Sequence, residues 1–402
     1  MSGESITQGL AAGMLPEKDY ERLTGRPPTY QKLKARKLGG WRRETSGKPQ
    51  ASQSHYILVG EQGLEAANMA SSELDVVSIG NAIVDIMCRC DDAFLSRMGL
   101  VKGALRIVNS ADELSQIASQ FPRRLEIAGG SGSNVAVGVA SFGGRSAFVG
   151  KVLDDTLGRI FRHDLKGSGV ETHVRVDGHP DGQTARSLIL ITPDGQRTML
   201  TYLGVHTDLG VDLVSPQTMK NAKCLFVEGY LFDVPSSRVT AKQALTFARG
   251  VGRMTALALL DPNCVARNRL IFRQIMKSGL DLLIANEAEI LSLYQSESFE
   301  DAAALVAKDT RQCVLTRGSK GSVVITGGKS TTVSAVAVPK VVDATGAGDM
   351  FIAGLLFGLC RGRTLEQAAK LGSFAAAEII SQVSARPEVR LSHSARLRGL
   401  LV

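Results

Sequence analysis

Residues 343–360 read DATGAGDMFIAGLLFGLC, a loop of small residues that leads directly into an apolar stretch. Small residues ahead of a helix leave backbone N–H groups unobstructed at its positive end, so the loop can form an anion hole for a phosphoryl group. Asp349, in the predicted first turn, can take the proton of an acceptor hydroxyl. A tight turn with Asp349 as a helix cap is the alternative, and the whole string ahead of a buried helix favours catalysis.

Short apolar runs alternate with helical patterns from residue 74 onward. The runs LDVVSIG, KCLFVEG, TALALLD, DLLIAN and QCVLTRG are typical of buried parallel strands, and the stretches between them have apolar residues at helical spacing. This alternation predicts an α/β fold with a doubly wound, mostly parallel sheet flanked by helices. Two regions depart from this alternation of strand and helix patterns. One is VDIMCRC, and the other is the pair RSLILIT and RTMLTY, which a Pro-Asp-Gly-Gln turn joins into a hairpin. Together they predict a small β-sheet that can act as a lid.

The chain divides into an extension and one catalytic domain. Residues 1–72 are polar and partly basic, without sustained strand or helix periodicity, and we interpret them as weakly ordered or as docking on a protein partner. The catalytic domain is expected at 73–395, with lid strands within about 82–110 and 183–205. The extension lacks a signal-peptide pattern, and its early acidic residues argue against a transit peptide. We therefore expect a cytoplasmic protein, with organelle import through the extension left open.

The composition limits the classes of partner that the protein is expected to bind. The chain has 402 residues, of which 44% are hydrophobic and 21% charged, as in ordinary globular proteins. Its net charge of +8 is dispersed and is not interleaved with aromatic residues, so no nucleic-acid partner is expected. No apolar stretch is long enough to cross a membrane. The six cysteines lack zinc-site spacing and are interpreted as buried residues in a reducing compartment.

A second glycine-rich loop, AGGSGSN at residues 128–134, precedes another helical stretch. Its glycines would let a substrate approach the backbone, and Asn134 offers both a donor and an acceptor to vicinal hydroxyls. Taken alone, the loop is equally well explained as a packing turn. It does not match the dinucleotide fingerprint, and the chain contains no Walker A sequence, so ATP would have to bind without a P-loop lysine.

Two further motifs follow predicted strands. Asn286 and Glu289 come after DLLIA, at the carboxyl end of a strand, where ligands of open α/β sheets bind. Their oxygens suit Mg²⁺, held directly or through water, although a helix start with acidic residues in its first turn explains them as well. The string TRGSKG at residues 316–321 follows QCVL. Its glycines can admit a nucleotide or form a connecting turn.

These four motifs, in this order, resemble those of the PfkB (ribokinase-like) carbohydrate kinase family over roughly residues 74–390. The resemblance implies a ribokinase-like sheet with a small β-sheet lid and MgATP along the carboxyl edge of the main sheet. It implies that Asp349 is the general base and that the lid residue Arg197, in DGQRT, approaches the transferring phosphate. The anion hole would be formed by Gly346, Ala347 and Gly348.

The same resemblance assigns the remaining binding residues. Asp85, in GNAIVD, matches the acceptor-binding aspartate of the family, and Asn286 and Glu289 would organise Mg²⁺. The residues expected around the acceptor are Asn81, Asp85, Gly129, Gly130 and Asn134. Those expected around the nucleotide are Asn286, Thr316, Gly318 and Gly321. A monovalent cation such as K⁺ occurs beside the anion hole in part of the family, and its presence here is left open.

Within the family, AGGSGSN and RTMLTYLGV are closer to adenosine-kinase-like members than to ribokinases. The resemblance therefore implies transfer of the γ-phosphate of ATP to the 5′-hydroxyl of an adenosine-like nucleoside. A free-sugar acceptor and a non-catalytic scaffold that uses the extension remain alternatives. Ala344, where the family usually has Thr, precedes the glycines and should leave the base and anion hole intact. Exposed lid strands can pair between subunits, so a homodimer is compatible with the sequence.

Overall fold

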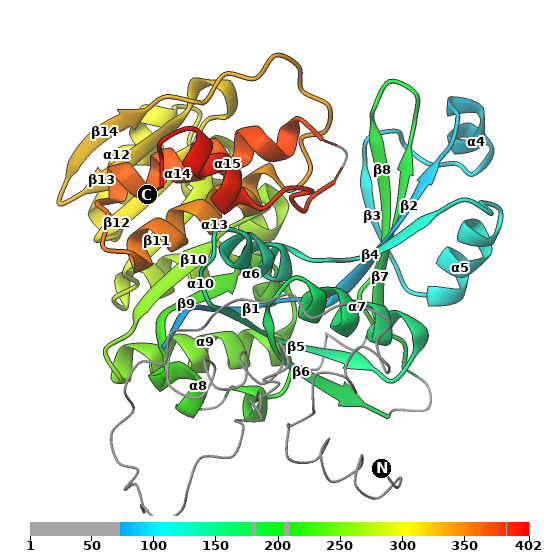
Figure 1. Cartoon of the computed structure of the whole chain (residues 1–402), viewed down its shortest axis with the longest axis horizontal. Helices are drawn as coiled ribbons and strands as arrows, with labels where there is room; N and C mark the ends of the chain where they lie inside the picture. The colour runs from blue at the N-terminus through cyan, green and yellow to red at the C-terminus, as the bar shows by residue number, and fades with distance from the viewer. Residues whose placement is uncertain (1–72, 179–181, 205–208, 215, 383, 402) are drawn as a thin grey trace, which may run out of the picture. The chain divides into compact units, whose positions relative to one another are not determined.

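The computed structural model describes residues 73–178, 182–204, 209–214, 216–382 and 384–401, and the predicted extension at 1–72 lies outside this part of the chain (Figure 1). The strands are β1 (Leu74–Ile79), β2 (Ile83–Arg89), β3 (Leu105–Val108), β4 (Leu125–Gly129), β5 (Ser146–Leu153), β6 (Glu171–Asp177), β7 (Ala185–Ile191), β8 (Arg197–Tyr202), β9 (Ala222–Glu228), β10 (Met254–Ala258), β11 (Leu282–Asn286), β12 (Gln312–Thr316), β13 (Ser322–Thr326) and β14 (Lys329–Val333). The helices are α4 (Asp92–Arg97), α5 (Ala111–Ser119), α6 (Ser131–Ser141), α7 (Thr156–Gly167), α8 (Pro216–Lys220), α9 (Pro235–Gly250), α10 (Pro262–Lys277), α11 (Glu287–Tyr294), α12 (Phe299–Asp309), α13 (Ala347–Cys360), α14 (Leu365–Ile380) and α15 (Leu391–Leu397). The short 3₁₀ helices among the described residues are η2 (Val211–Leu213), η3 (Gly229–Asp233) and η4 (Gly318–Lys320).

The main sheet has nine strands in the order β14-β13-β12-β11-β10-β9-β1-β5-β6. The strands from β12 to β6 run parallel, which confirms the expected α/β fold, while β13 and β14 form an antiparallel edge. Every parallel strand ends at the same edge of the sheet. The residues that follow β1, β9, β11 and β12 therefore gather at one carboxyl edge.

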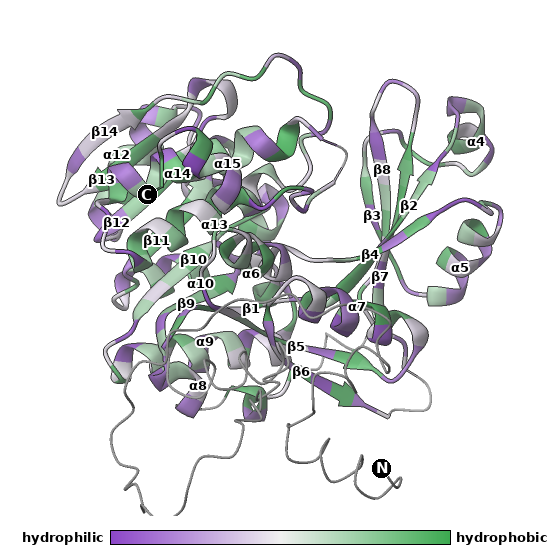
Figure 2. Ribbon diagram, viewed as in Figure 1, coloured by the Kyte–Doolittle hydropathy of each residue, from purple (hydrophilic) through white to green (hydrophobic). Residues whose placement is uncertain are grey.

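Apolar residues of the main sheet are buried on both of its faces, and Figure 2 colours each residue of the sheet by its hydropathy. In β9, Leu225 and Val227 belong to a core shared with α9, α10 and α12, whereas Cys224 and Phe226 belong to a core shared with α13. The near-continuous apolar runs in the sequence follow from this burial on both sides. Within the described residues, no helix combines the length and apolar character needed to span a membrane.

The second sheet is the lid, with five strands in the order β3-β8-β7-β2-β4. The predicted hairpin is confirmed as the antiparallel pair β7 and β8. The strand β4 also belongs to the lid, although its sequence lies outside the ranges expected for lid strands. One face of the lid packs on α4 and α5, which lie on the side away from α13 and α14 (Figure 1). The opposite face of this sheet is the one expected to border the candidate active site.

Candidate active site

The anion loop, residues 343–349, ends in the first turn of α13. Gly346 is the N-cap residue and has a φ of +77°, a left-handed conformation that favours glycine. A Cβ at Gly346 would lie 2.7 Å from the Cα of Ala385, whereas a Cβ at Gly348 would meet no atom within 4 Å. The backbone beside Gly348 is therefore open, as an anion hole requires. Asp349 follows in the same turn and is 8% exposed.

Asp349 is held by the helix that the second glycine-rich loop starts. The Nδ2 of Asn134, in the first turn of α6, donates to the Oδ2 of Asp349 at 2.9 Å. Burial raises the pKa of Asp349, while hydrogen bonds from Asn134 and Ser131 and the charge of Arg386 oppose that rise. The raised pKa brings this carboxyl nearer to the range in which a general base works efficiently.

Asp85 reaches the site from the lid strand β2. A Cβ at Gly129 would lie 2.3 Å from the Oδ2 of Asp85, so the absence of a side chain at Gly129 makes room for the carboxylate. Burial raises the pKa of Asp85 to about 7, against the charges of Arg386 and Arg197, and the charge of Asp349 adds to the rise. The structure thus brings together the predicted base and the predicted acceptor-binding aspartate.

Asn81 is 5% exposed and lies at the carboxyl end of β1. Its backbone N–H donates to Glu228 Oε1 at 2.8 Å, and a Cβ at Gly130, whose φ is +86°, would lie 2.3 Å from its carbonyl oxygen. The Oδ1 of Asn81 is buried and has no hydrogen-bond partner in the described structure. Such an acceptor calls for a partner, and a substrate hydroxyl would supply one.

The sequence did not single out Glu228, which ends β9. Its two carboxylate oxygens accept from the N–H groups of Asn81, at 2.8 Å, and Gly132, at 2.7 Å, and so connect the segment after β1 with the start of α6. Burial raises its pKa to about 8. The one signal for it was an acidic residue at the end of the apolar run KCLFVEG.

The lid contacts the anion loop through an ion pair. Arg197, at the start of β8, donates from Nη2 to Oδ2 of Asp343, and the two side chains are 11% and 8% exposed. The Oδ1 of Asp343 accepts from the N–H of Thr345 at 3.1 Å. Arg197 was expected near the transferring phosphate, and its pairing with Asp343 places it at the start of the anion loop.

The residues expected around the nucleotide lie at the ends of two neighbouring strands. Asn286 of β11 and Thr316 of β12 are register partners. Gly318 and Gly321 follow with φ values of +55° and +85°, and a Cβ at Gly321 would lie 2.1 Å from the carbonyl oxygen of Val333. The turn into β13 therefore requires glycine at 321 independently of any ligand.

Asn286 and Glu289 form a reciprocal capping box at the start of α11. The Oδ1 of Asn286 accepts from the N–H of Glu289 at 2.9 Å, and Glu289 Oε2 accepts from the N–H of Asn286 at 3.0 Å. Glu289 Oε1 accepts from the Nδ2 of Asn286 at 2.5 Å, so both carboxylate oxygens are engaged. Glu289 is 3% exposed, and burial raises its pKa to about 7.

Each carboxylate oxygen of Glu289 already accepts one hydrogen bond within the cap, so a Mg²⁺ ion bound here, directly or through water, would share these oxygens with the cap. No group of three or more His, Cys, Asp or Glu side chains among the described residues is arranged to hold a metal ion. The helix-start interpretation of this motif thus accounts for its hydrogen bonds.

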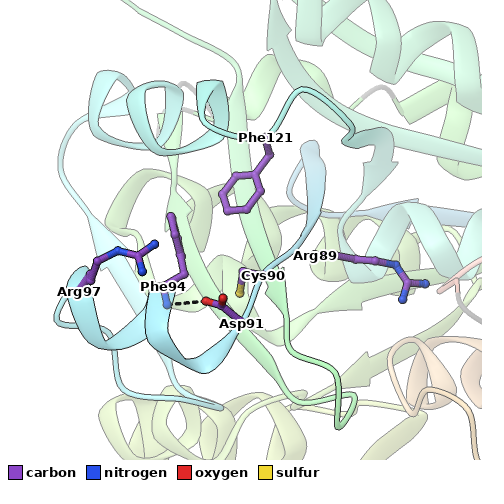
Figure 3. A pocket seen from close by; sticks show the side chains of 6 residues that line it. All are labelled: Arg89, Cys90, Asp91, Phe94, Arg97 and Phe121. Atoms are coloured by element: carbon purple, nitrogen blue, oxygen red, sulfur yellow. Dashed lines mark hydrogen bonds between the residues drawn. The ribbon is translucent and has the colours of Figure 1, made fainter.

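A separate shallow pocket lies on the lid, beside the start of α4 (Figure 3). The Oδ1 of Asp91 caps α4 by accepting from the N–H of Phe94 at 2.7 Å, and the rings of Phe94 and Phe121 meet edge to face at 4.9 Å. The residues that line the pocket are Arg89, Cys90, Asp91, Phe94, Arg97 and Phe121. None of these residues belongs to the site around Asp349.

This fold and site define a class of ATP-dependent phosphotransferase. Residues 103–390 match the pfkB family carbohydrate kinase, and the chain belongs to that family. It acts on a carbohydrate or nucleoside hydroxyl, as PfkB-type kinases do.

The chain is similar to two solved structures and to one curated relative in the following degrees. The chain is 44% identical to the adenosine kinase from Sinorhizobium meliloti, with 81% of this chain and 100% of that chain covered and a TM-score of 0.76. It is 39% identical to a "probable sugar kinase protein" from Rhizobium etli CFN 42, with 82% and 100% covered and a TM-score of 0.77. It is 25% identical to the 5-dehydro-2-deoxygluconokinase of Geobacillus thermodenitrificans, over 70% of this chain and 87% of that protein.

Proposed function

We propose that this protein transfers the γ-phosphate of ATP to the 5′-hydroxyl of an adenosine-like nucleoside, with Asp349 as the general base. The observation that carries the proposal is a row of apolar side chains across the lid, directly beside Asp85. A ribose can place its vicinal hydroxyls on Asp85 while its base lies on the apolar row.

The pairing register of the lid defines this row. Asp85 lies in one cross-strand row, beside Ile127 of β4 and Ser187 of β7. Two residues further along each strand, and so on the same face, lies the apolar row. Its five members, one from each strand, are Leu125, Met87, Ile189, Met199 and Leu105.

The apolar row is not part of the core that the lid shares with α4 and α5. Leu188 and Leu200, which alternate with members of the row, fill that core instead. The row is exposed at its two edges, where Leu105 and Leu125 are 53% and 52% exposed, and buried at its centre, where Met87 and Ile189 are 9% and 3% exposed. An apolar row with exposed edges next to a charged site favours a ligand that has both an apolar and a hydroxyl-bearing part. A nucleoside has both, and a free sugar lacks the apolar part.

The chemistry follows from the residues around Asp349. Its carboxylate takes the proton of the acceptor hydroxyl while the new O–P bond forms and the bond from the γ-phosphorus to ADP breaks. The N–H groups of Gly346 and Gly348 and the positive end of α13 stabilise the charge of the moving phosphoryl group, while the N–H of Ala347 donates to the carbonyl oxygen of Ala344 at 3.3 Å. Mg²⁺ with ATP would neutralise phosphate charge, organised through water by Asn286 and Glu289.

The proposal is tested by supplying MgATP with adenosine, inosine, guanosine, cytidine, ribose or fructose and measuring ADP release against Asp349→Asn. We expect turnover with a purine nucleoside. Turnover with free sugars alone would contradict the nucleoside proposal. It would instead favour a sugar kinase activity, which is the kind of activity that the name of the Geobacillus relative gives. Absence of turnover with every acceptor would favour the scaffold alternative.

A second variant tests the apolar row itself. Met199→Gln keeps the side-chain volume but makes it polar, and we expect the KM for the nucleoside to rise about tenfold while the KM for ATP stays unchanged. Val101→Thr is the matched control, because Val101 is 74% exposed and lies outside the row. Equal nucleoside KM values for the Met199→Gln variant and the wild type would contradict the role of the row.

A further inference from the structure

Arg386 enters the site from the segment that follows α14, far from the motifs that the sequence analysis singled out. Its neighbour Ala385 is buried and lies against Gly346, so this segment contacts the anion loop. The segment is held locally, because the N–H of Arg386 donates to Ser384 Oγ at 3.1 Å and its carbonyl accepts from Gln382 Nε2 at 2.5 Å. The guanidinium is thereby directed at α6.

A chain of hydrogen bonds runs from Arg386 to the base. Its Nε donates to the Oδ1 of Asn134 at 3.2 Å, and its Nη2 donates to Ser133 Oγ at 3.1 Å. The Nδ2 of Asn134 in turn donates to Asp349 at 2.9 Å. An amide has one accepting end and one donating end. Because Arg386 occupies the accepting end, the donating end must point at Asp349.

We infer that Arg386 is a positioning residue for the phosphoryl-transfer reaction: it fixes the orientation of Asn134 and, through it, the carboxylate of Asp349. The inference rests on the proposed role of Asp349 as the base. It also reassigns Asn134, which the sequence places on the acceptor hydroxyls, to the support of the base.

The charge of Arg386 supports the same role. Asp349 is faced by Asn134 and Ser131 from α6, Asp85 from β2, Glu228 from β9 and Tyr230 from η3, and by Arg386. Among the described charges acting on Asp349, that of Arg386 favours the carboxylate. Burial lowers the pKa of Arg386 to about 10, so it still carries its charge at neutral pH.

The kinetic test compares Arg386→Gln and Arg386→Lys with the wild type, using Arg390→Gln, an exposed arginine on the same segment, as control. We expect Arg386→Gln to lower kcat by about tenfold to a hundredfold and to move the acid limb of the kcat profile up by about one pH unit. Arg386→Lys should restore the position of that limb. A lower kcat in Arg386→Gln without a shift of the acid limb would overturn the inference. An equal shift of that limb in Arg386→Lys would overturn it as well.

A second measurement needs no substrate, so it separates this inference from the proposed function. The difference in unfolding free energy between wild type and Asp349→Asn, followed against pH, reports the pKa of Asp349. The same difference is then measured between the Arg386→Gln variant and the Arg386→Gln, Asp349→Asn double variant. Without the charge of Arg386, the change of this difference with pH should occur at higher pH. An unmoved transition would show that Arg386 does not act on Asp349, whatever the acceptor proves to be.

Discussion

Arg197 of the lid and Asp343 of the anion loop form a nearly buried ion pair, with side chains 11% and 8% exposed. The pair joins the sheet expected over the acceptor to the loop expected under the phosphate. A change in the position of the lid would therefore act directly on the anion loop.

The first prediction concerns this pair. Arg197→Met should lower kcat by about a hundredfold and raise ATP hydrolysis in the absence of an acceptor, because an unpinned lid admits water. Arg197→Lys, which keeps the charge, should have a smaller effect on hydrolysis. Both rates are measured by ADP release. Normal turnover with unchanged hydrolysis in Arg197→Met would refute the coupling.

The second prediction separates two glycines of the anion loop. Gly346→Ala should destabilise the fold by at least about 1 kcal/mol, because its φ is +77° and the new Cβ would lie 2.7 Å from Ala385. Gly348→Ala should leave the unfolding free energy within about 1 kcal/mol, since its Cβ meets open space in a helix. It should nevertheless lower kcat by crowding the phosphoryl group. Equal activity of Gly348→Ala and the wild type would show that this space is not used.

The third prediction concerns Asp85. Asp85→Asn should raise the KM for the acceptor about tenfold to a hundredfold with little change in the KM for ATP, because a charged acceptor of hydrogen bonds is lost. Steady-state kinetics with each substrate varied in turn measure both constants. An unchanged acceptor KM, or an equal rise for ATP, would remove Asp85 from the acceptor site.

The fourth prediction is a pH dependence of stability. Burial raises the pKa of Asp85, Glu228 and Glu289 from 3.8, 4.5 and 4.5 to about 7, 8 and 7. The folded protein therefore binds more protons than the unfolded chain between pH about 4 and 8, and the unfolding free energy should fall as pH rises through this window. Each group contributes on the order of 1 kcal/mol or more.

Urea unfolding of the ligand-free protein between pH 5 and 8 measures this slope. Glu228→Gln cannot titrate and should make the slope shallower, even though it also loses a hydrogen bond. A slope in this variant as steep as in the wild type would show that the titration of Glu228 does not contribute.

Sequence patterns predicted the elements whose characteristic residues are contiguous in the chain. The anion loop and Asp349 lie in one string, and the parallel strands are uniform apolar runs, so both could be recognised from local pattern. Glu228 could not, since it is one acidic residue at the end of a buried strand. Arg386 comes from a segment with no motif of its own, and only the tertiary fold brings it to Asn134.

The lid also combines features that local sequence predicts with features that only the tertiary fold creates. Its hairpin was predictable from turn residues, but the apolar row depends on the pairing register of five strands. The strand β4 was not predicted: it has only five residues, and its burial does not alternate, since Leu125 is exposed and Glu126 and Ile127 are half-buried. The motif at Asn286 shows the opposite case, in which a pattern interpreted as a metal site is also a complete helix cap.

The most direct test of the central claim is single-turnover transfer of phosphate from ATP to the accepted nucleoside by the wild type and by Asp349→Asn, with ATP binding and unfolding free energy as controls. We predict a transfer rate at least about a hundredfold lower in the variant, with ATP binding retained. Transfer by Asp349→Asn at close to the wild-type rate would contradict Asp349 as the base.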